Sequence, residues 1–198
     1  PTINPYFSEK DMESLQKTEK AAEAGDVKKQ FFTGLIYAGY SELAVPKDCA
    51  KAVYWLERSA ASGGGGYVLL AEMAMDGHCM PPDVEQAKAW YTKAASDGNT
   101  YAQEMLAQIE KPNKAMQVYF ETLKEAWSGD TAAMRHLGLQ LAHYKGRIFD
   151  GATGWEIELL QHRWRGFQWF CRAADAGDTE AMHIMMESYK AGFGPCVW

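Results

Sequence analysis

The sequence predicts an all-α protein built from stacked helix pairs, and two features support this fold class. First, a turn of small residues and glycine recurs five times, each time after a basic residue and an alanine. The glycines of these turns follow one another at intervals of 38, 35, 31 and 48 residues, and a period of about 35 is typical of repeated helical hairpins. Second, the segments after the turns place small and large apolar residues on one helical stripe. The turn glycines are Gly25, Gly63, Gly98, Gly129 and Gly177.

The elements can be assigned in chain order. Residues 8–24 resemble the second helix of a pair without its first. In the next two layers, a first helix follows the turn glycine, and a second helix opens at Asp48 or Asp83, whose carboxylate can accept free backbone N–H groups. The layer between Gly98 and Gly129 is degenerate, because it is short and lacks the glycine loop and the tryptophan of the other layers. About four repeats with terminal half-repeats are therefore expected.

The last interval is the longest, which predicts an insertion near residues 145–165. We expect an extended loop near residues 145–154 and then a long helix from about residue 155 to residue 176. After the final turn glycine, one more first helix leads into a glycine loop at the end of the sequence. Such half-repeats can cap a stack, since a terminal layer has one solvated face.

Two side-chain positions recur with the turns. A tryptophan stands eight residues before the turn glycine in three layers, and this regular spacing predicts a core position. A basic residue stands five residues before every turn glycine, where it complements the negative end of the helix. The tryptophans are Trp55, Trp90 and Trp169, and the basic residues are Lys20, Arg58, Lys93, Lys124 and Arg172.

Composition and charge narrow the functional classes. The chain has 198 residues, of which 47% are hydrophobic, so it can bury about 70% of its unfolded surface without support from a metal or a disulfide. The net charge of −6 means that the chain has no excess of Lys and Arg to bind the phosphate groups of a nucleic acid, which argues against nucleic-acid binding. No run of about 18 apolar residues is present, so membrane insertion is not expected. We predict one continuous domain over residues 1–198.

The repeat resembles a known family. Its order is Gly-Asp or Gly-Asn, Ala, Leu-Gly, Tyr, Gly, and then Asp-x-x-Lys-Ala-x-x-Trp-Tyr-x-Lys-Ala-Ala. This order is similar to the Sel-one-like repeat (SLR), a relative of the tetratricopeptide repeat; residues 77–99 match it best, and the resemblance covers roughly residues 10–195. The resemblance implies a right-handed superhelical solenoid of about ten helices in antiparallel pairs. It also implies that the first helices line a concave surface that binds another protein.

The family geometry assigns the positions three, six, ten and thirteen past each turn glycine to the concave surface. The predicted groove is apolar in the early layers and more polar towards the end, which suits an extended peptide or a protruding element of another protein. The insertion adds aromatic and basic residues of the kind enriched at binding hot spots, although a helix that covers one end of the stack explains them equally well. The predicted partner-binding residues are Phe31, Leu35, Met73, Tyr101, Arg135, Leu139 and His183 on the concave surface, and Trp155, Arg163 and Trp164 in the insertion.

We therefore expect a non-enzymatic protein-binding module, with no cofactor and no metal. Proteins similar to this one in bacteria serve as adaptors, or as immunity proteins that neutralise a secreted toxic effector. Two alternatives stay open: an exported hydrolase-like enzyme with a pocket at the 145–165 insertion, and an architectural scaffold of a membrane-associated complex. A phosphate loop at residues 62–66 is disfavoured, because the glycine run lacks the Gly-Lys-Ser or Gly-Lys-Thr ending.

The cysteines and histidines show no spacing typical of a catalytic or metal site. The sequence lacks a Cys-x-x-Cys motif and a His-Glu-x-x-His motif, and the five histidines are expected on the surface or hydrogen-bonded in the core. The even number of cysteines permits two disulfides in an exported protein, or thiols in a reducing cytosol. Export, for instance to the bacterial periplasm, is slightly favoured. The cysteines are Cys49, Cys79, Cys171 and Cys196.

Overall fold

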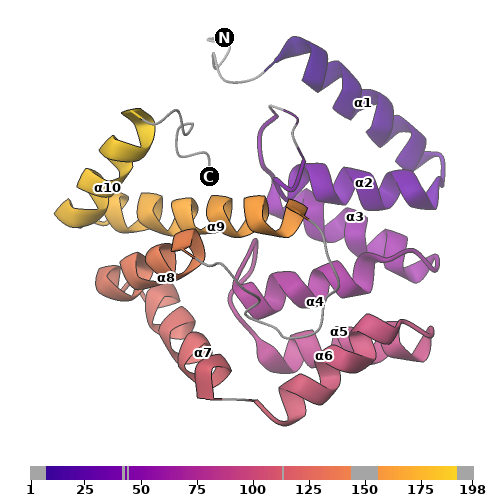
Figure 1. Cartoon of the computed structure of the whole chain (residues 1–198). Coiled ribbons are helices and arrows are strands. Elements are labelled where there is room, and N and C mark those ends of the chain that lie inside the picture. The colour runs from indigo at the N-terminus through magenta and orange to yellow at the C-terminus, as the bar shows by residue number, and fades with distance from the viewer. Residues whose placement is uncertain (1–7, 42, 44, 113, 144–155, 191–198) are drawn as a thin grey trace. The chain divides into compact units, whose positions relative to one another are not determined.

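A computed structural model of the protein describes residues 8–41, 43, 45–112, 114–143 and 156–190, and the side chains of these residues except 142–143, 156–165 and 188–190. These residues form ten α-helices and no strand. The predicted all-α fold of stacked antiparallel helix pairs is confirmed (Figure 1). The helices are α1 (Glu9–Glu23), α2 (Val27–Tyr37), α3 (Cys49–Ala61), α4 (Gly66–Asp76), α5 (Val84–Ser96), α6 (Thr100–Glu110), α7 (Lys114–Trp127), α8 (Thr131–His143), α9 (Glu156–Asp175) and α10 (Thr179–Lys190).

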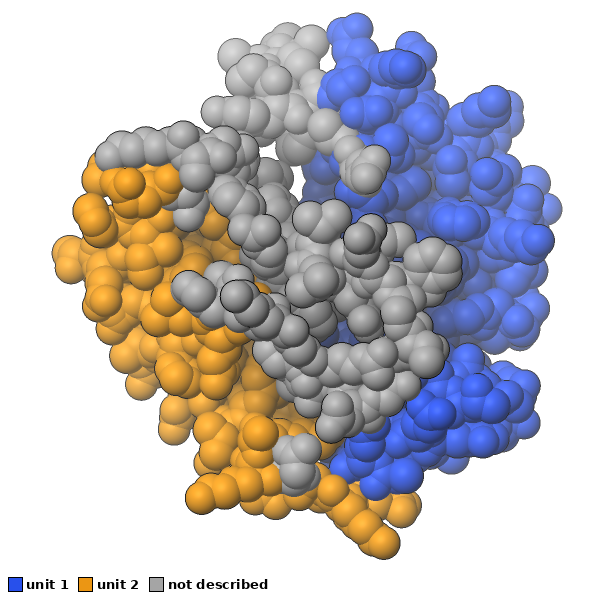
Figure 2. Space-filling model, in the orientation of Figure 1, with its two compact units in different colours: residues 1–109 blue, residues 110–198 orange. Residues whose placement is uncertain are grey.

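The helices group into two compact units, residues 1–109 and residues 110–198 (Figure 2). In unit 1, α1 packs on α2, α2 on α3, α3 on α4, and α4 on α5. In unit 2, α8 packs on both α7 and α9, and α10 packs on α9. The long helix predicted after the insertion is α9, which begins at Glu156 and ends at Asp175. The predicted loop at 145–154 lies outside the described residues, and the single domain over 1–198 stays a prediction.

The recurring turn ends one helix and begins the next. All five turn glycines have a positive φ, from 79° to 107°, which is the left-handed conformation that glycine adopts without steric cost. In four of the five turns the next residue is Asp or Asn, and its side-chain oxygen accepts a hydrogen bond from the backbone N–H three residues later. These four capping residues are Asp26, Asn99, Asp130 and Asp178.

The second helices of the two complete repeats begin as predicted. Asp48 accepts a hydrogen bond from the Lys51 N–H at 3.0 Å, and Asp83 accepts one from the Gln86 N–H at 2.9 Å. Both aspartates have an extended backbone and stand directly before the first helical residue. They are therefore N-cap residues of α3 and α5.

We predict that Asp83→Ala lowers the free energy of unfolding by about 1 kcal/mol, because the first turn of α5 loses its only described side-chain acceptor and a favourable charge. Urea unfolding followed by circular dichroism measures this change. Asp97→Ala is the matched control, since it removes the same charge at the other end of α5. An equal loss of stability in the control would attribute the effect to net charge, not to capping.

The repeated tryptophans lie in the core, as predicted. Trp55, Trp90 and Trp169 are all at most 9% exposed. Trp55 belongs to a cluster of buried residues from α1, α2 and α3 in unit 1. Trp169 belongs to a second cluster, formed by residues of α7, α8, α9 and α10 in unit 2. Each unit thus has its own apolar core.

Glycines inside or at the start of helices allow close packing between neighbours. A Cβ atom on Gly34 of α2 would lie 2.6 Å from the side chain of Leu56 in α3, and one on Gly138 of α8 would lie 2.6 Å from the ring of Phe170 in α9. Both glycines stand nine residues after a turn glycine, so the close contact belongs to the repeat. The glycine run at 62–66 has the same role, because Gly66 begins α4 directly against the backbone of Leu56. Its predicted role as a repeat turn is borne out by this geometry.

None of the described helices is long and apolar enough to cross a membrane.

Candidate functional site

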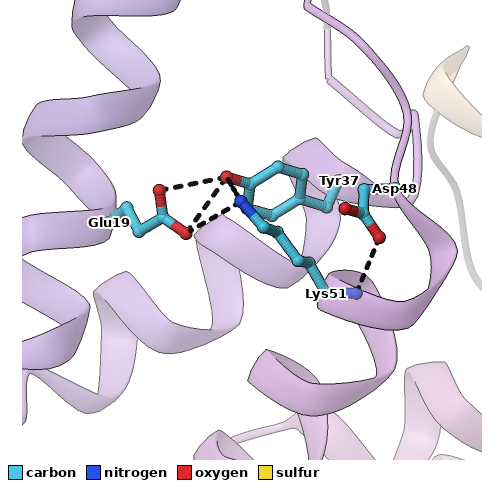
Figure 3. Close-up of polar contacts among 4 residues, drawn as sticks. All are labelled: Glu19, Tyr37, Asp48 and Lys51. Carbon is cyan, nitrogen blue, oxygen red and sulfur yellow. Dashed lines mark hydrogen bonds and ion pairs between the residues drawn. The ribbon is translucent and has the colours of Figure 1, made fainter.

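A polar cluster holds the terminal helix α1 against the first repeat (Figure 3). The Tyr37 hydroxyl of α2 donates to the Glu19 carboxylate of α1 at 3.0 Å and accepts from the Lys51 ammonium of α3 at 3.0 Å. Lys51 also lies 3.7 Å from Glu19. Burial raises the pKa of the Tyr37 hydroxyl, the hydrogen bond from Lys51 lowers it, and the Glu19 carboxylate raises it again. The net result is a raised pKa, so the phenol stays neutral and donates its proton to Glu19 in a hydrogen bond. The cluster thus links α1 to both helices of the first repeat.

The predicted partner-binding residues of unit 1 differ in accessibility. Phe31, Leu35 and Tyr101 are half-buried and keep part of their surface open to solvent. Met73 is completely buried, because it lies on the side of α4 that packs into the core of the unit. Its side chain therefore cannot contact a partner in this structure, and we remove it from the proposed surface.

The predicted residues of unit 2 lie on α8 and α10. Leu139 is 40% exposed, and His183 is exposed as well. Arg135 is half-buried, its Nε atom lies 3.6 Å from Asp178, and it forms a short ion pair with Glu180. Arg135 thus connects α8 to the first turn of α10, so it has a structural role beside any role in binding.

The remaining predicted residues belong to the insertion. Trp155 lies outside the described residues. Arg163 and Trp164 are part of α9, but their side chains are also outside the described part of the chain. The predicted hot spot at the insertion therefore stays a prediction.

A disulfide joins Cys49, the first residue of α3, to Cys79 in the loop between α4 and α5. The Cα atoms of the two residues are 4.9 Å apart. Next to it, the His78 ring lies 4.7 Å from the Tyr40 ring, and its Nε2 atom is 2.7 Å from the Ala38 carbonyl oxygen. The sequence left this pairing open, and the structure places the corresponding loops of two successive repeats side by side.

The other described cysteine, Cys171, is 1% exposed and is also disulfide-bonded. A disulfide-bonded cysteine has no thiolate to act as a nucleophile. In the structure, Cys171 and Cys79 are therefore both structural residues. His78 is buried with a hydrogen-bonding partner, as expected for a core histidine.

The two arginines among the basic residues before the turns lie over aromatic rings, in addition to their expected position at the helix end. Arg58 lies 5.5 Å from the ring centroid of Trp55, three residues earlier in the same helix. In unit 2, Arg172 lies 4.7 Å from Trp169 and 4.4 Å from Trp127. Burial lowers the pKa of Arg172. The spacing of Arg58 and Trp55, and of Arg172 and Trp169, could have predicted this cation–π contact from the sequence.

Tyrosines and carboxylates meet where α4, α5 and α6 come together in unit 1. The Tyr101 hydroxyl of α6 donates to the Glu72 carboxylate of α4 at 3.0 Å. The Tyr91 ring of α5 packs edge-on against the Tyr101 ring, with 6.4 Å between the centroids. Asp76 follows Glu72 by one helical turn and lies on the same side of α4. Of these four residues, the repeat offsets place Tyr101 and Asp76 on the predicted concave surface, whereas Glu72 and Tyr91 join them only through tertiary packing.

Within the described ranges, no group of three or more His, Cys, Asp or Glu side chains is arranged to hold a metal ion.

The comparisons with known proteins agree with the repeat pattern. The family model described as Sel1 repeat matches residues 30–64, 66–99 and 165–178. The chain is 29% identical over 175 residues to the chitin synthase regulator SKT5 of Saccharomyces cerevisiae, with 80% of this chain and 24% of that protein covered. It thus spans about a quarter of the length of this curated relative.

A Sel1 repeat protein from Oxalobacter formigenes, known from a crystal structure, is 22% identical, with a TM-score of 0.44 and coverage of 87% of this chain and 67% of that chain. The family-model segments fall mainly on the pairs α2–α3 and α4–α5 and on the second half of α9. The degenerate layer of α6 and α7 lies almost wholly outside those segments, as its departures from the repeat pattern suggested. The chain is therefore similar to Sel1 repeats over these segments.

Proposed function

We propose that this chain is a non-enzymatic protein–protein interaction module, and more specifically a bacterial adaptor or immunity protein that binds and neutralises a secreted effector. The observation that carries the proposal is the set of Sel1 repeats, since repeats of this kind generally mediate protein–protein interaction. The yeast relative is a chitin synthase regulator, which is consistent with action on another protein. A solenoid repeat uses most of its apolar residues for stacking, so its function depends on the side chains left at the surface.

The surface of unit 2 supplies a candidate contact. Leu139 of α8 and His183 of α10 are exposed, and Arg135 ties these two helices together at the first turn of α10. An exposed apolar side chain on a scaffold held by ion pairs is the type of residue that forms a binding hot spot. We therefore retain Leu139 and His183 as partner-binding residues.

The Cys49–Cys79 disulfide supports a role outside a reducing cytosol. Disulfides persist in oxidising compartments such as the bacterial periplasm. An exported binding protein would meet a secreted effector there. This is the reason to prefer the immunity role over that of a cytosolic adaptor.

Affinity capture with the full chain as bait, followed by mass spectrometry, tests the proposal, and the product of the neighbouring gene is assayed first. Binding to the purified partner is then measured by calorimetry. We expect Leu139→Arg to weaken this binding by about 2 kcal/mol or more, roughly 30-fold, because a charge replaces an apolar contact. Val118→Arg is the matched control: Val118 is equally exposed, but it lies on α7.

The possible outcomes distinguish the role of Leu139 from the protein-binding function itself. Equal affinity of both variants and the unmodified chain would remove Leu139 from the binding surface. Failure to bind any protein, together with turnover of a substrate, would instead favour the hydrolase-like alternative.

A further inference from the structure

Arg172, in the last turn of α9, lies over the rings of two tryptophans in unit 2. Its guanidinium carbon Cζ is 4.4 Å from the ring centroid of Trp127 in α7 and 4.7 Å from that of Trp169 in its own helix. Trp169 is buried in the core of the unit, and Trp127 is partly buried against the same core. The core thus fixes the two rings that hold this charged group.

The Arg172 guanidinium has no acceptor in the described part of the chain. No described residue accepts a hydrogen bond from it or forms an ion pair with it, although Asp175 follows it by one helical turn. Burial is the cause that lowers the pKa of Arg172, with no contribution from a carboxylate. A guanidinium stays charged and has five N–H donors, so a half-buried one without a counter-ion costs free energy. Its donors are therefore available to an acidic ligand.

The Trp127 indole supplies a second donor without an acceptor. Its Nε1 atom is buried and makes no hydrogen bond to any residue that the structure describes. A buried donor of this kind costs free energy, and in a native protein it calls for an explanation. Lys124 stands three residues earlier on α7 and is exposed, so it adds positive charge on the same side of the helix. An oxygen ligand would satisfy both unpaired donors.

The counterpart in unit 1 shows that the repeat alone does not require this arrangement. Arg58 also stands five residues before a turn glycine and lies 5.5 Å from the ring centroid of Trp55. It is exposed, however, and donates a hydrogen bond to the Tyr54 hydroxyl at 3.0 Å. In α9 the corresponding residue is Gln168, and no hydrogen bond joins its described side chain to Arg172. Of the two arginines, only Arg172 thus keeps its donors for a ligand.

The chemistry of the site favours a carboxylate ligand. A guanidinium binds a carboxylate through two parallel N–H···O bonds, and such charge-assisted bonds are among the strongest in proteins. The indole donor is neutral, so Arg172 supplies the one full charge at the centre of the site. A net charge of −6 on the whole chain disfavours a dianion such as phosphate. The two rings can also pack against the hydrocarbon part of an acidic residue.

We propose that Arg172, together with Trp127 and Trp169, binds a carboxylate group presented by a protein partner. The inference rests on the proposed function, and it adds the chemistry of one partner contact. Arg172 is half-buried, so the ligand reaches its guanidinium from solvent. One carboxylate oxygen accepts from the guanidinium, and the other accepts from the Trp127 indole N–H when the Arg172 side chain turns towards the ligand.

Titration of the full ¹⁵N-labelled chain, followed by NMR, tests the site directly. The probes are acetyl-Gly-Glu-Gly-amide, acetyl-Gly-Gly-Gly with a free C-terminus, the neutral acetyl-Gly-Gln-Gly-amide, and inorganic phosphate. We expect the carboxylate peptides to shift the amide resonances at the ends of α7 and α9, and the indole N–H resonance of Trp127, in a saturable manner. The neutral peptide should leave them unchanged, and phosphate should bind more weakly. The tighter carboxylate peptide shows whether a side chain or a chain terminus is the preferred source.

Variants assign the effect to the site. Arg172→Gln should weaken peptide binding at least about tenfold, and Trp127→Phe, which keeps a ring but loses the N–H donor, about threefold. Arg172→Lys keeps the charge without the two-pronged donor geometry, so its affinity should lie between those of Arg172→Gln and the unmodified chain. The matched control is Arg58→Gln, which changes the net charge equally at the same repeat position in unit 1. Thermal unfolding verifies that each variant is folded.

Three results would overturn the inference. They are the absence of peptide-induced shifts at the ends of α7 and α9, an equal loss of affinity in Arg58→Gln, and tighter binding of phosphate than of either carboxylate peptide. Unchanged affinity of Trp127→Phe would overturn the assignment of the indole N–H as a donor.

The proposed function is tested separately with the captured partner. Its affinity should also fall at least about tenfold in Arg172→Gln and stay the same in Arg58→Gln. Unchanged partner affinity in Arg172→Gln overturns the assignment of this site to the partner, but leaves the protein-binding function intact.

Discussion

Cys49→Ser should lower the free energy of unfolding by about 3 to 4 kcal/mol. The disulfide between Cys49 and Cys79 closes a loop with a sequence separation of 30. Closing a loop of this length removes conformational entropy from the unfolded chain, and the loss of entropy corresponds to about this free energy. The Cα–Cα distance of 4.9 Å lies in the ordinary range for a disulfide.

The native contacts around the bond favour an effect of this size. The loop that carries Cys79 begins with the left-handed C-cap Gly77, and Cys79 itself has a φ of 61°. The neighbouring His78 contacts the Ala38 carbonyl oxygen and the Tyr40 ring of the preceding repeat. Without the disulfide, the two loops keep these noncovalent contacts but lose their covalent link. We therefore expect greater mobility of the loop in addition to the lower stability.

Urea unfolding at equilibrium, with the other cysteines kept oxidised, measures the effect. Cys79→Ser should cost the same as Cys49→Ser, and the double variant should cost no more than either, because all three variants lack the same bond. Additive losses would mean that the two side chains contribute independently. In that case the disulfide would not be the source of the stability.

Local signals made the fold predictable. The turn glycines have the left-handed conformation that a glycine after a helix permits, and Asp48 and Asp83 form the N-caps expected from their type and position. Trp55 and its counterparts are buried because their spacing follows the repeat. Each of these features depends on residues that are close together in the sequence. A local sequence pattern is therefore sufficient to predict it.

The candidate sites depend on contacts between residues far apart in sequence. Cys49 and Cys79 meet only because two successive repeats stack, and no spacing rule identifies that pair. The Tyr91 ring of α5 packs against the Tyr101 ring of α6 for the same reason. Met73 was assigned to the surface by its offset from the turn glycine, but the packing of α4 in the core buries it. The distance of a residue from the turn glycine therefore predicts on which face of the helix it lies. Tertiary packing then decides whether that residue is accessible to a partner.

The glycine run before α4 leads to the second large prediction. Gly66→Ala should lower the free energy of unfolding by about 3 kcal/mol, because a Cβ atom at this position collides with the carbonyl oxygen of Leu56 in α3. The clash is with backbone, so no side-chain rotation relieves it, and the Ala60 side chain lies 3.1 Å away on the same side. The start of α4 would have to move away from α3, which opens the contact between two repeats.

Gly65→Ala is the matched control, one residue earlier in the chain. Its Cβ atom would meet only the Phe31 ring, at 3.8 Å, and its φ of −71° suits any residue. We expect a clearly smaller loss, about 1 kcal/mol or less, because the added methyl group fits and only the N-cap preference for glycine over alanine is lost. Chemical denaturation of the Gly66→Ala and Gly65→Ala variants measures both changes. Equal stabilities would show that α3 and α4 can separate at this point without cost. The close approach at Gly66 would then not determine how the repeats stack.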